Sequence, residues 1–122
     1  MTERRFTVEE ANAELPALRE ILPAIQAARA GLIDASARIT DAVASDGGGV
    51  AGSDWFAHQQ ALRDGLEELA RRGIVLRDTQ TGLVDFPAEH DGEPVYLCWR
   101  MGEGDVGYYH GEHGGYRSRR PL

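Results

Sequence analysis

Lysine is absent from this sequence, and its 13 basic residues, all arginine, are outnumbered by 20 acidic residues. The net charge of −7 argues against nucleic acid as the main partner, because binding to phosphates requires clustered cations. It argues equally against an anionic membrane surface. The one short basic run, residues 117–120, is expected to lie in a solvated tail. Arginine without lysine, together with many alanine and glycine residues, suggests a GC-rich bacterial genome.

Cysteine is also scarce. The single cysteine, Cys98, excludes an internal disulfide and fits a reducing compartment. No apolar run approaches the roughly 20 residues that a membrane-spanning helix needs. The first ten residues, MTERRFTVEE, lack the apolar segment of a signal peptide. We therefore expect a soluble, cytoplasmic protein, and 122 residues are the length of a single domain.

Helical signals dominate residues 1–46. Thr7 and Glu10 have the spacing of a capping box, which predicts a short N-terminal helix that ends near Glu14. Pro16 suits the first turn of a second, longer helix. Apolar residues then recur every three or four positions, as on one face of a helix. They are Leu15, Leu18, Leu22, Ile25, Leu32, Ile39 and Val43.

Arg29 interrupts this apolar face. A guanidinium buried there would be a structural buried charge, and it would need an acidic partner such as Asp85 or Glu103. The alternative is that the aliphatic stem of Arg29 packs on the face while its charge reaches water.

A glycine-rich loop, residues 47–53, separates the first helical arm from a second, residues 54–73. Two helices joined by a short loop should pack antiparallel, and Gly73 is expected to end the second. Because the second arm is the shorter, the apolar face over residues 15–25 should lack a helical partner. Either the C-terminal half of the chain or a second copy of it must then cover this part of the face.

Beyond Gly73 the apolar pattern changes to a period of two, which predicts antiparallel strands. Asp91-Gly92 is a hairpin-turn signal, and Pro87 is expected to end a strand. The predicted strands are residues 74–78, 83–86, 94–100 and 105–110, followed by a tail over residues 111–122. The fold class is α+β: a long antiparallel helical hairpin, with a short N-terminal helix, followed by a small antiparallel sheet of three or four strands. Residues 1–122 form a single domain, with the sheet over residues 74–110.

The last two strands predict a cluster of reactive side chains. A turn symmetric about Glu103 would pair Cys98 with Tyr108 and Tyr96 with His110, so that these four side chains share one face. Asp85, on the neighbouring strand, could approach them from the side. The candidate site residues are Asp85, Cys98, Glu103 and His110.

Thiolate, imidazole and carboxylate groups together suit zinc or iron. A metal site here would use Cys98, His110, His113 and a carboxylate from Glu103, Glu112 or Asp85. The sequence has no cysteine pair and no His-Glu-x-x-His motif, so its spacing does not specify a metal. Two alternatives remain open: Cys98 is a nucleophile with His110 as its base, or Cys98 is a small buried apolar residue and the histidines belong to a polar tail.

Two stretches resemble a known family. They are GLVDFPAEHDGEPVYLCWRMGE at residues 82–103, followed by a histidine at position 110 and by RRPL, and FTVEEANAELPALR at residues 6–19. Together they resemble the bacterial domain-of-unknown-function family 2203. The matching positions are Gly82, Leu83, Asp85, Phe86, Pro87, Leu97, Cys98, Trp99, Gly102, Glu103 and His110. The sequence departs from the family at Tyr109, where tryptophan is usual, and in its tail GEHGGYRSRR. The family has no established activity that the resemblance could assign to this protein. The Asp, Cys, Glu and His that recur in its motif are residue types expected in a functional site.

Two functional hypotheses follow. The first is an interaction or regulatory module, which would use the helical hairpin to form a homodimer or to dock a protein partner. The alternative is a metal- or small-molecule-binding protein, or an enzyme, that uses the Asp/Cys/Glu/His cluster with zinc or iron as its cofactor. Neither nucleic acid nor a membrane is expected as a partner.

Overall fold

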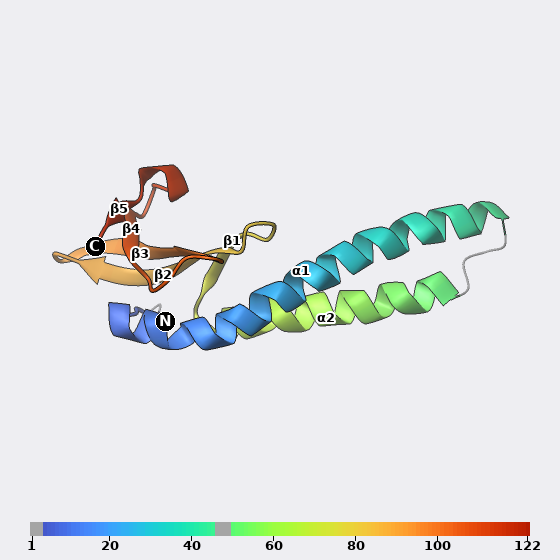
Figure 1. The fold of residues 1–122 in the computed structure, drawn as a ribbon, viewed down its shortest axis with the longest axis horizontal. Coiled ribbons are helices and arrows are strands. Elements are labelled where there is room, and N and C mark those ends of the chain that lie inside the picture. Colours follow the sequence, from blue (N-terminus) through green and yellow to red (C-terminus); the bar gives the residue numbers. More distant parts are fainter. Residues whose placement is uncertain (1–3, 46–49) are drawn as a thin grey trace.

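The computed structural model describes residues 4–45 and 50–122, which form two long helices followed by one five-stranded antiparallel sheet (Figure 1). The helices are α1 (Val8–Ser45) and α2 (Val50–Arg72), with a short 3-10 helix η1 (Tyr116–Ser118). The strands are β1 (Val75–Asp78), β2 (Leu83–His90), β3 (Glu93–Arg100), β4 (Tyr108–Gly111) and β5 (Arg120–Pro121), and they lie in this order in the sheet. The predicted α+β fold is confirmed, with five strands in place of three or four. Neither long helix is apolar enough over its described length to cross a membrane.

The start of α1 has the predicted capping box. The Thr7 backbone N–H donates to Glu10 Oε1 at 2.9 Å, and the Glu10 backbone N–H donates to Thr7 Oγ1 at 3.1 Å. The separate short helix was a wrong prediction, because α1 continues without interruption through Pro16 and Pro23. A proline inside a helix costs about 3 kcal/mol. Full burial of large apolar side chains on both sides of Pro16, each worth about 1.5–3 kcal/mol, offsets that cost.

The connection between the helices is shorter than predicted. Residues 50–53 belong to α2, while residues 47–49 of the predicted glycine-rich loop lie outside the described residues. Gly73 ends α2 as predicted, with a φ of 78° that favours glycine. The Gly73 N–H donates to the Ala70 carbonyl and the Ile74 N–H to the Leu69 carbonyl, both at 3.0 Å, which is the Schellman arrangement.

The two helices pack antiparallel over most of α2. Gly65 lies against Ile25, and Arg72 Nη1 lies 2.8 Å from Glu14 Oε2, so α2 reaches almost to the start of α1. The prediction that residues 15–25 lack a helical partner was therefore wrong, because the early start of α2 shifts the pairing of the helices toward the start of α1. The sheet covers the same face, and Leu15, Leu18 and Leu22 share one core with Phe86 and Trp99.

The sheet follows the predicted pattern of turns. Asp91 and Gly92 join β2 to β3 with φ values of 52° and 79°, as a type I′ turn requires. Pro87 does not end β2, which was a wrong prediction: β2 runs on to His90. Beyond Asp85, β2 has no β1 partner, and there the Pro87 carbonyl accepts a hydrogen bond from the Phe6 N–H at 2.7 Å. The N–H that proline lacks therefore falls on the open side of the strand.

The two faces of the sheet differ. Val84, Phe86, Leu97 and Trp99 point toward the helices and are buried in the core. The opposite face, called the outer face below, carries the alternate residues of the same strands, including Asp85 and Cys98.

Residues 111–122 do not form a free tail, which corrects the prediction. Figure 1 shows η1 on the side of the sheet opposite to the helices, and β5 pairs with β4 at the sheet edge. Arg119 anchors this segment to the rest of the sheet: its guanidinium donates hydrogen bonds to Glu103 and lies over the ring of Tyr108. Within the segment it also lies over the ring of Tyr116. The Leu122 N–H donates to the Gly107 carbonyl at 2.9 Å.

Candidate functional site

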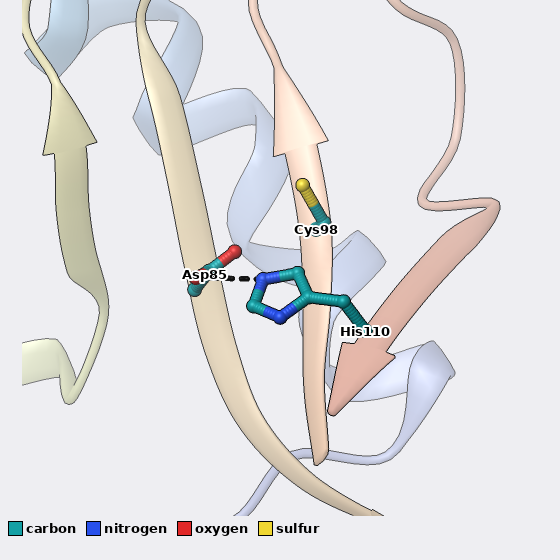
Figure 2. Close-up of side chains that lie close together, drawn as sticks. All are labelled: Asp85, Cys98 and His110. Carbon is teal, nitrogen blue, oxygen red and sulfur yellow. Dashed lines mark hydrogen bonds and ion pairs between the residues drawn. The ribbon is translucent and has the colours of Figure 1, made fainter. Parts of the chain in front are cut away.

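Three neighbouring strands bring Asp85, Cys98 and His110 together on the outer face. Asp85 of β2 is directly opposite Cys98 of β3, and the predicted register of β3 with β4 is confirmed: Cys98 pairs with Tyr108 and Tyr96 with His110. Figure 2 shows Asp85 and His110 pointing toward each other across β3, with Cys98 on β3 beside them and helical ribbon behind the sheet. One ligand atom from each residue lies within 4.8 Å of the other two.

Asp85 is the central residue of this cluster. Its Oδ2 atom lies 2.8 Å from Arg77 Nε and 3.0 Å from His110 Nε2, while only 1% of the residue is exposed. Its Oδ1 atom is buried and has no hydrogen-bond partner among the described residues. An unsatisfied buried acceptor of this kind costs about 1–3 kcal/mol, and more when it is charged. Such an atom in a native fold calls for an explanation, and an ion or a water bound by the carboxylate is one.

The orientation of His110 suits a ligand at Nε2. The Nδ1 atom lies 2.8 Å from the carbonyl oxygen of Gly111, which can only accept, so Nδ1 carries a hydrogen and donates it. Without metal, the 3.0 Å contact of Nε2 with Asp85 Oδ2 also requires a hydrogen between these two atoms, and a metal ion at Nε2 would replace it. In metal sites the non-ligating ring nitrogen of histidine commonly donates to a backbone carbonyl in this way. Tyr96 packs beside the ring, with the two centroids 5.6 Å apart. The ring is thus fixed with Nε2 facing Asp85.

Cys98 is a buried thiol. Burial, and next the negative charge of Asp85, raise its pKa to about 11, against the opposing effect of Arg119. The side chain is 1% exposed. A thiol with a raised pKa and little exposure is a poor nucleophile. This environment therefore argues against Cys98 as an activated nucleophile, whereas a bound divalent ion would remove the thiol proton directly.

A cavity of about 230 Å³ opens beside the cluster. Asp85 and His110 contribute to its wall, together with Arg77 of β1, Leu83 of β2 and residues 112–116. This last segment includes His113 and Tyr116. Residues 112–116 therefore extend over the outer face from the end of β4, which gives the buried cluster a cavity of its own.

Glu103, a predicted ligand, has a different role. Its two carboxylate oxygens bind Arg119 Nη1 and Nη2 at 3.0 and 2.5 Å, and Oε1 also accepts the Arg100 backbone N–H at 2.8 Å. The hydrogen bonds from Arg119 hold the pKa of Glu103 below its usual value. Glu103 is not part of the cluster of ligand atoms found among the described residues. It instead anchors the C-terminal segment to the β3–β4 turn.

The other predicted residues lie farther from the cluster. His113 and Glu112 are exposed on the cavity wall, and neither belongs to the buried group of ligand atoms. Arg29 is exposed, so its guanidinium is not a buried charge. This agrees with the alternative prediction, in which the charge of Arg29 reaches water.

Sequence reasoning missed two arginines around the site. Arg77 orients Asp85 and lies 4.9 Å from the ring of Tyr96. Arg119 lies between the rings of Tyr108 and Tyr116, 4.0 and 4.2 Å from their centroids. The basic run at residues 117–120 was expected to be solvated. The nearby aromatic residues were the available signal that one of its arginines could pack on aromatic rings.

The three buried residues fit a divalent metal in the chemistry of their donor atoms. Zinc takes Cys sulfur at about 2.3 Å, and His nitrogen and carboxylate oxygen at about 2.0–2.2 Å. Tetrahedral geometry at these bond lengths places the donors about 3.5 Å apart. The donors here lie within 4.8 Å of one another, so side-chain movements on the order of 1 Å would close them on an ion.

Comparisons with known proteins agree with the resemblance seen in the sequence. A family model described as "Uncharacterized conserved protein (DUF2203)" matches residues 4–122. No curated protein and no solved structure matches the chain. Because the family model matches nearly the whole chain, this protein belongs to the DUF2203 family.

Proposed function

We propose that the protein binds a divalent transition metal, zinc above all, through Asp85, Cys98 and His110. The observation that carries this proposal is the buried, unpartnered Oδ1 atom of Asp85 next to a thiol and an oriented imidazole. A purely structural carboxylate at this depth would be expected to satisfy both oxygens. A metal ion gives Oδ1 a partner and compensates the burial of its charge.

The donor set favours zinc over magnesium or calcium. Magnesium and calcium prefer oxygen donors, whereas thiolate and imidazole select zinc or another transition metal. Iron accepts the same donor types, and the test below separates the two metals by elemental analysis.

The fixed surroundings of the ligands support a dedicated site. Arg77 holds Oδ2 of Asp85, and the Gly111 carbonyl holds Nδ1 of His110, so two of the three ligands have partners of their own. Partners of this kind orient metal ligands, and their loss commonly lowers metal affinity by about 10–100-fold.

Metal analysis of protein without a histidine tag tests the proposal. The full chain is incubated with zinc and with ferrous iron, freed of excess by dialysis, and analysed by mass spectrometry of the elements. We expect one zinc per chain in the wild type and less than about a tenth of that in Asp85→Asn, because the amide is a weak ligand for zinc.

Asp91→Asn is the matched control. It makes the same chemical change at a carboxylate whose side chain is 90% exposed in the β2–β3 turn, where asparagine tolerates the positive φ. It should retain one zinc per chain. Equal zinc contents in all three proteins, or none in the wild type, would remove the proposed function.

An interaction module built on the helical hairpin is the second proposal. Figure 1 shows the outer part of the hairpin extending well beyond the sheet. Ile33 of α1 and Phe56 of α2 are 56% and 67% exposed. Large exposed apolar side chains of this kind favour contact with a second copy or with another protein. Light scattering on the wild type and on Phe56→Ser tests this, and a monomer at all concentrations would exclude the homodimer.

A further inference from the structure

We propose that the metal keeps one coordination position open to the cavity, and that this position takes a small carboxylate monoanion that Arg77 also holds. This inference rests on the proposed function. It concerns what the site binds besides the metal, and thus the class of ligand on which the protein acts.

The number of available protein ligands supports an open position. Among the described residues, Asp85, Cys98 and His110 are the group whose donor atoms converge, which supplies three ligands. Structural zinc sites have four protein ligands, whereas sites that act on another molecule have three and leave the fourth position free. Glu103 cannot supply the fourth because Arg119 binds both of its oxygens.

The cavity determines where the fourth ligand enters. Asp85 and His110 are part of the cavity wall, and Cys98 is not. An ion held by all three residues therefore has the cavity on the side of Asp85 and His110. A ligand that enters from the cavity meets the metal between these residues and Arg77.

The charges around Asp85 favour one negative charge on that ligand. A divalent ion is neutralised by the Asp85 carboxylate and the Cys98 thiolate, and Arg77 then leaves one positive charge in excess. A monoanion balances this excess. Glu112 also lies on the wall, but it is exposed, so solvent and salt screen its charge.

Arg77 is placed to recognise a carboxylate. Its Nε donates to Asp85 and its guanidinium lies over the ring of Tyr96, so the group is oriented before any ligand arrives. A guanidinium binds a planar carboxylate through directed hydrogen bonds. The cavity of about 230 Å³ is smaller than the ~300–1,000 Å³ typical of drug-sized ligands. A small organic acid fits this volume, and acetate is the simplest probe.

Cobalt substitution provides a direct test. The full-length chain is saturated with Co²⁺, and its visible absorption is followed while acetate is added at constant ionic strength set with perchlorate. We expect a saturable change in the cobalt bands of the wild type. Arg77→Gln, measured at its own metal saturation, should need about tenfold more acetate. Arg117→Gln, which changes an exposed arginine outside this cavity, should respond like the wild type.

His113→Ala separates an open site from a closed one. If His113 moved to become the fourth ligand, this variant would lose cobalt; we expect it to keep one cobalt per chain. The inference is overturned if acetate leaves the bands of the saturated wild type unchanged, if Arg77→Gln responds like the wild type, or if His113→Ala loses the metal. Failure of the wild type to bind cobalt would remove the proposed function and this inference together, whereas cobalt binding without an acetate response would remove only the inference.

Discussion

Asp85 of β2 and His110 of β4 meet over the intervening strand β3, with Oδ2 and Nε2 3.0 Å apart. Strands two apart in a sheet are separated by about 9.5 Å, so both side chains must lean over β3 to reach each other. They meet beside Cys98, which is directly opposite Asp85 in the register. This contact makes a buried cluster from residues on three strands (Figure 2).

Zinc should raise the thermal stability of the wild type. A ligand that binds only the folded state, at a free concentration 100 times its dissociation constant, raises the free energy of unfolding by about 2.7 kcal/mol. For a domain of this size that corresponds to a rise in Tm of about 10 °C. Differential scanning calorimetry with and without zinc checks this. Asp91→Asn should shift like the wild type, and an equal shift in Asp85→Asn would contradict the assignment of Asp85 as a ligand.

Cys98 should resist thiol reagents in the folded, metal-free protein. With a pKa of about 11, roughly one thiol in a thousand is ionised at pH 8, compared with about one in ten at the ordinary value of 9.0. Burial slows the reaction further. We expect labelling at least about 100-fold slower than in the protein unfolded by guanidinium, followed by absorbance of a chromogenic disulfide reagent. Labelling at the same rate in both states would show that Cys98 is not enclosed as described.

The Glu103–Arg119 pair should stabilise the fold in a pH-dependent way. The pKa of Glu103 is lowered in the folded state by Arg119, so its contribution is complete above the unfolded value and is lost as the pH falls through the folded value. Glu103→Gln should therefore cost about 2 kcal/mol at pH 7, and this difference from the wild type should shrink below about pH 4. Chemical denaturation at both pH values measures it.

The control for that experiment is Glu93→Gln, which changes an exposed glutamate at the start of β3. Its unfolding free energy should match that of the wild type at both pH values. A pH-independent loss in Glu103→Gln would mean that the charge of Glu103 is not what anchors the C-terminal segment.

Two glycines of α2 should respond with opposite sign to the same substitution. A Cβ on Gly65 would lie 2.5 Å from Cγ1 of the buried Ile25, so Gly65→Ala should destabilise by about 1–3 kcal/mol. Gly52 has no atom within 4 Å of that position, so Gly52→Ala should stabilise the helix by up to about 1 kcal/mol. Urea unfolding compares them. Destabilisation by Gly52→Ala, or none by Gly65→Ala, would contradict the described packing of α1 on α2.

Local signals made much of the fold predictable from the sequence. The capping box of Thr7 and Glu10, the helix end at Gly73 and the turn at Asp91-Gly92 each depend on residues close in the chain. The turn around Glu103 fixed the register, which placed Cys98 and His110 on one face. These features need only backbone preferences and alternation, which a sequence carries directly.

Contacts between residues far apart in the sequence explain why some of the predictions were wrong. Pro16 does not interrupt α1 because tertiary burial on both sides outweighs its cost, and Pro87 stays within β2 because its missing N–H faces an unpaired edge. The C-terminal segment folds back because Arg119 finds Glu103, 16 residues away, and two aromatic rings. No short-range pattern reports such partners, so the sequence identified the cluster but neither its cavity nor the arginines around it.

Titration of the metal-free wild type with Co²⁺ under reducing conditions measures the metal site most directly. If Asp85, Cys98 and His110 hold the ion, one equivalent should saturate a thiolate-to-cobalt charge-transfer band in the near ultraviolet. Cys98→Ser should lose that band, and His110→Ala should weaken binding by at least about tenfold. A wild type that shows no charge-transfer band at saturating cobalt, or a Cys98→Ser protein with the same band, would contradict the account.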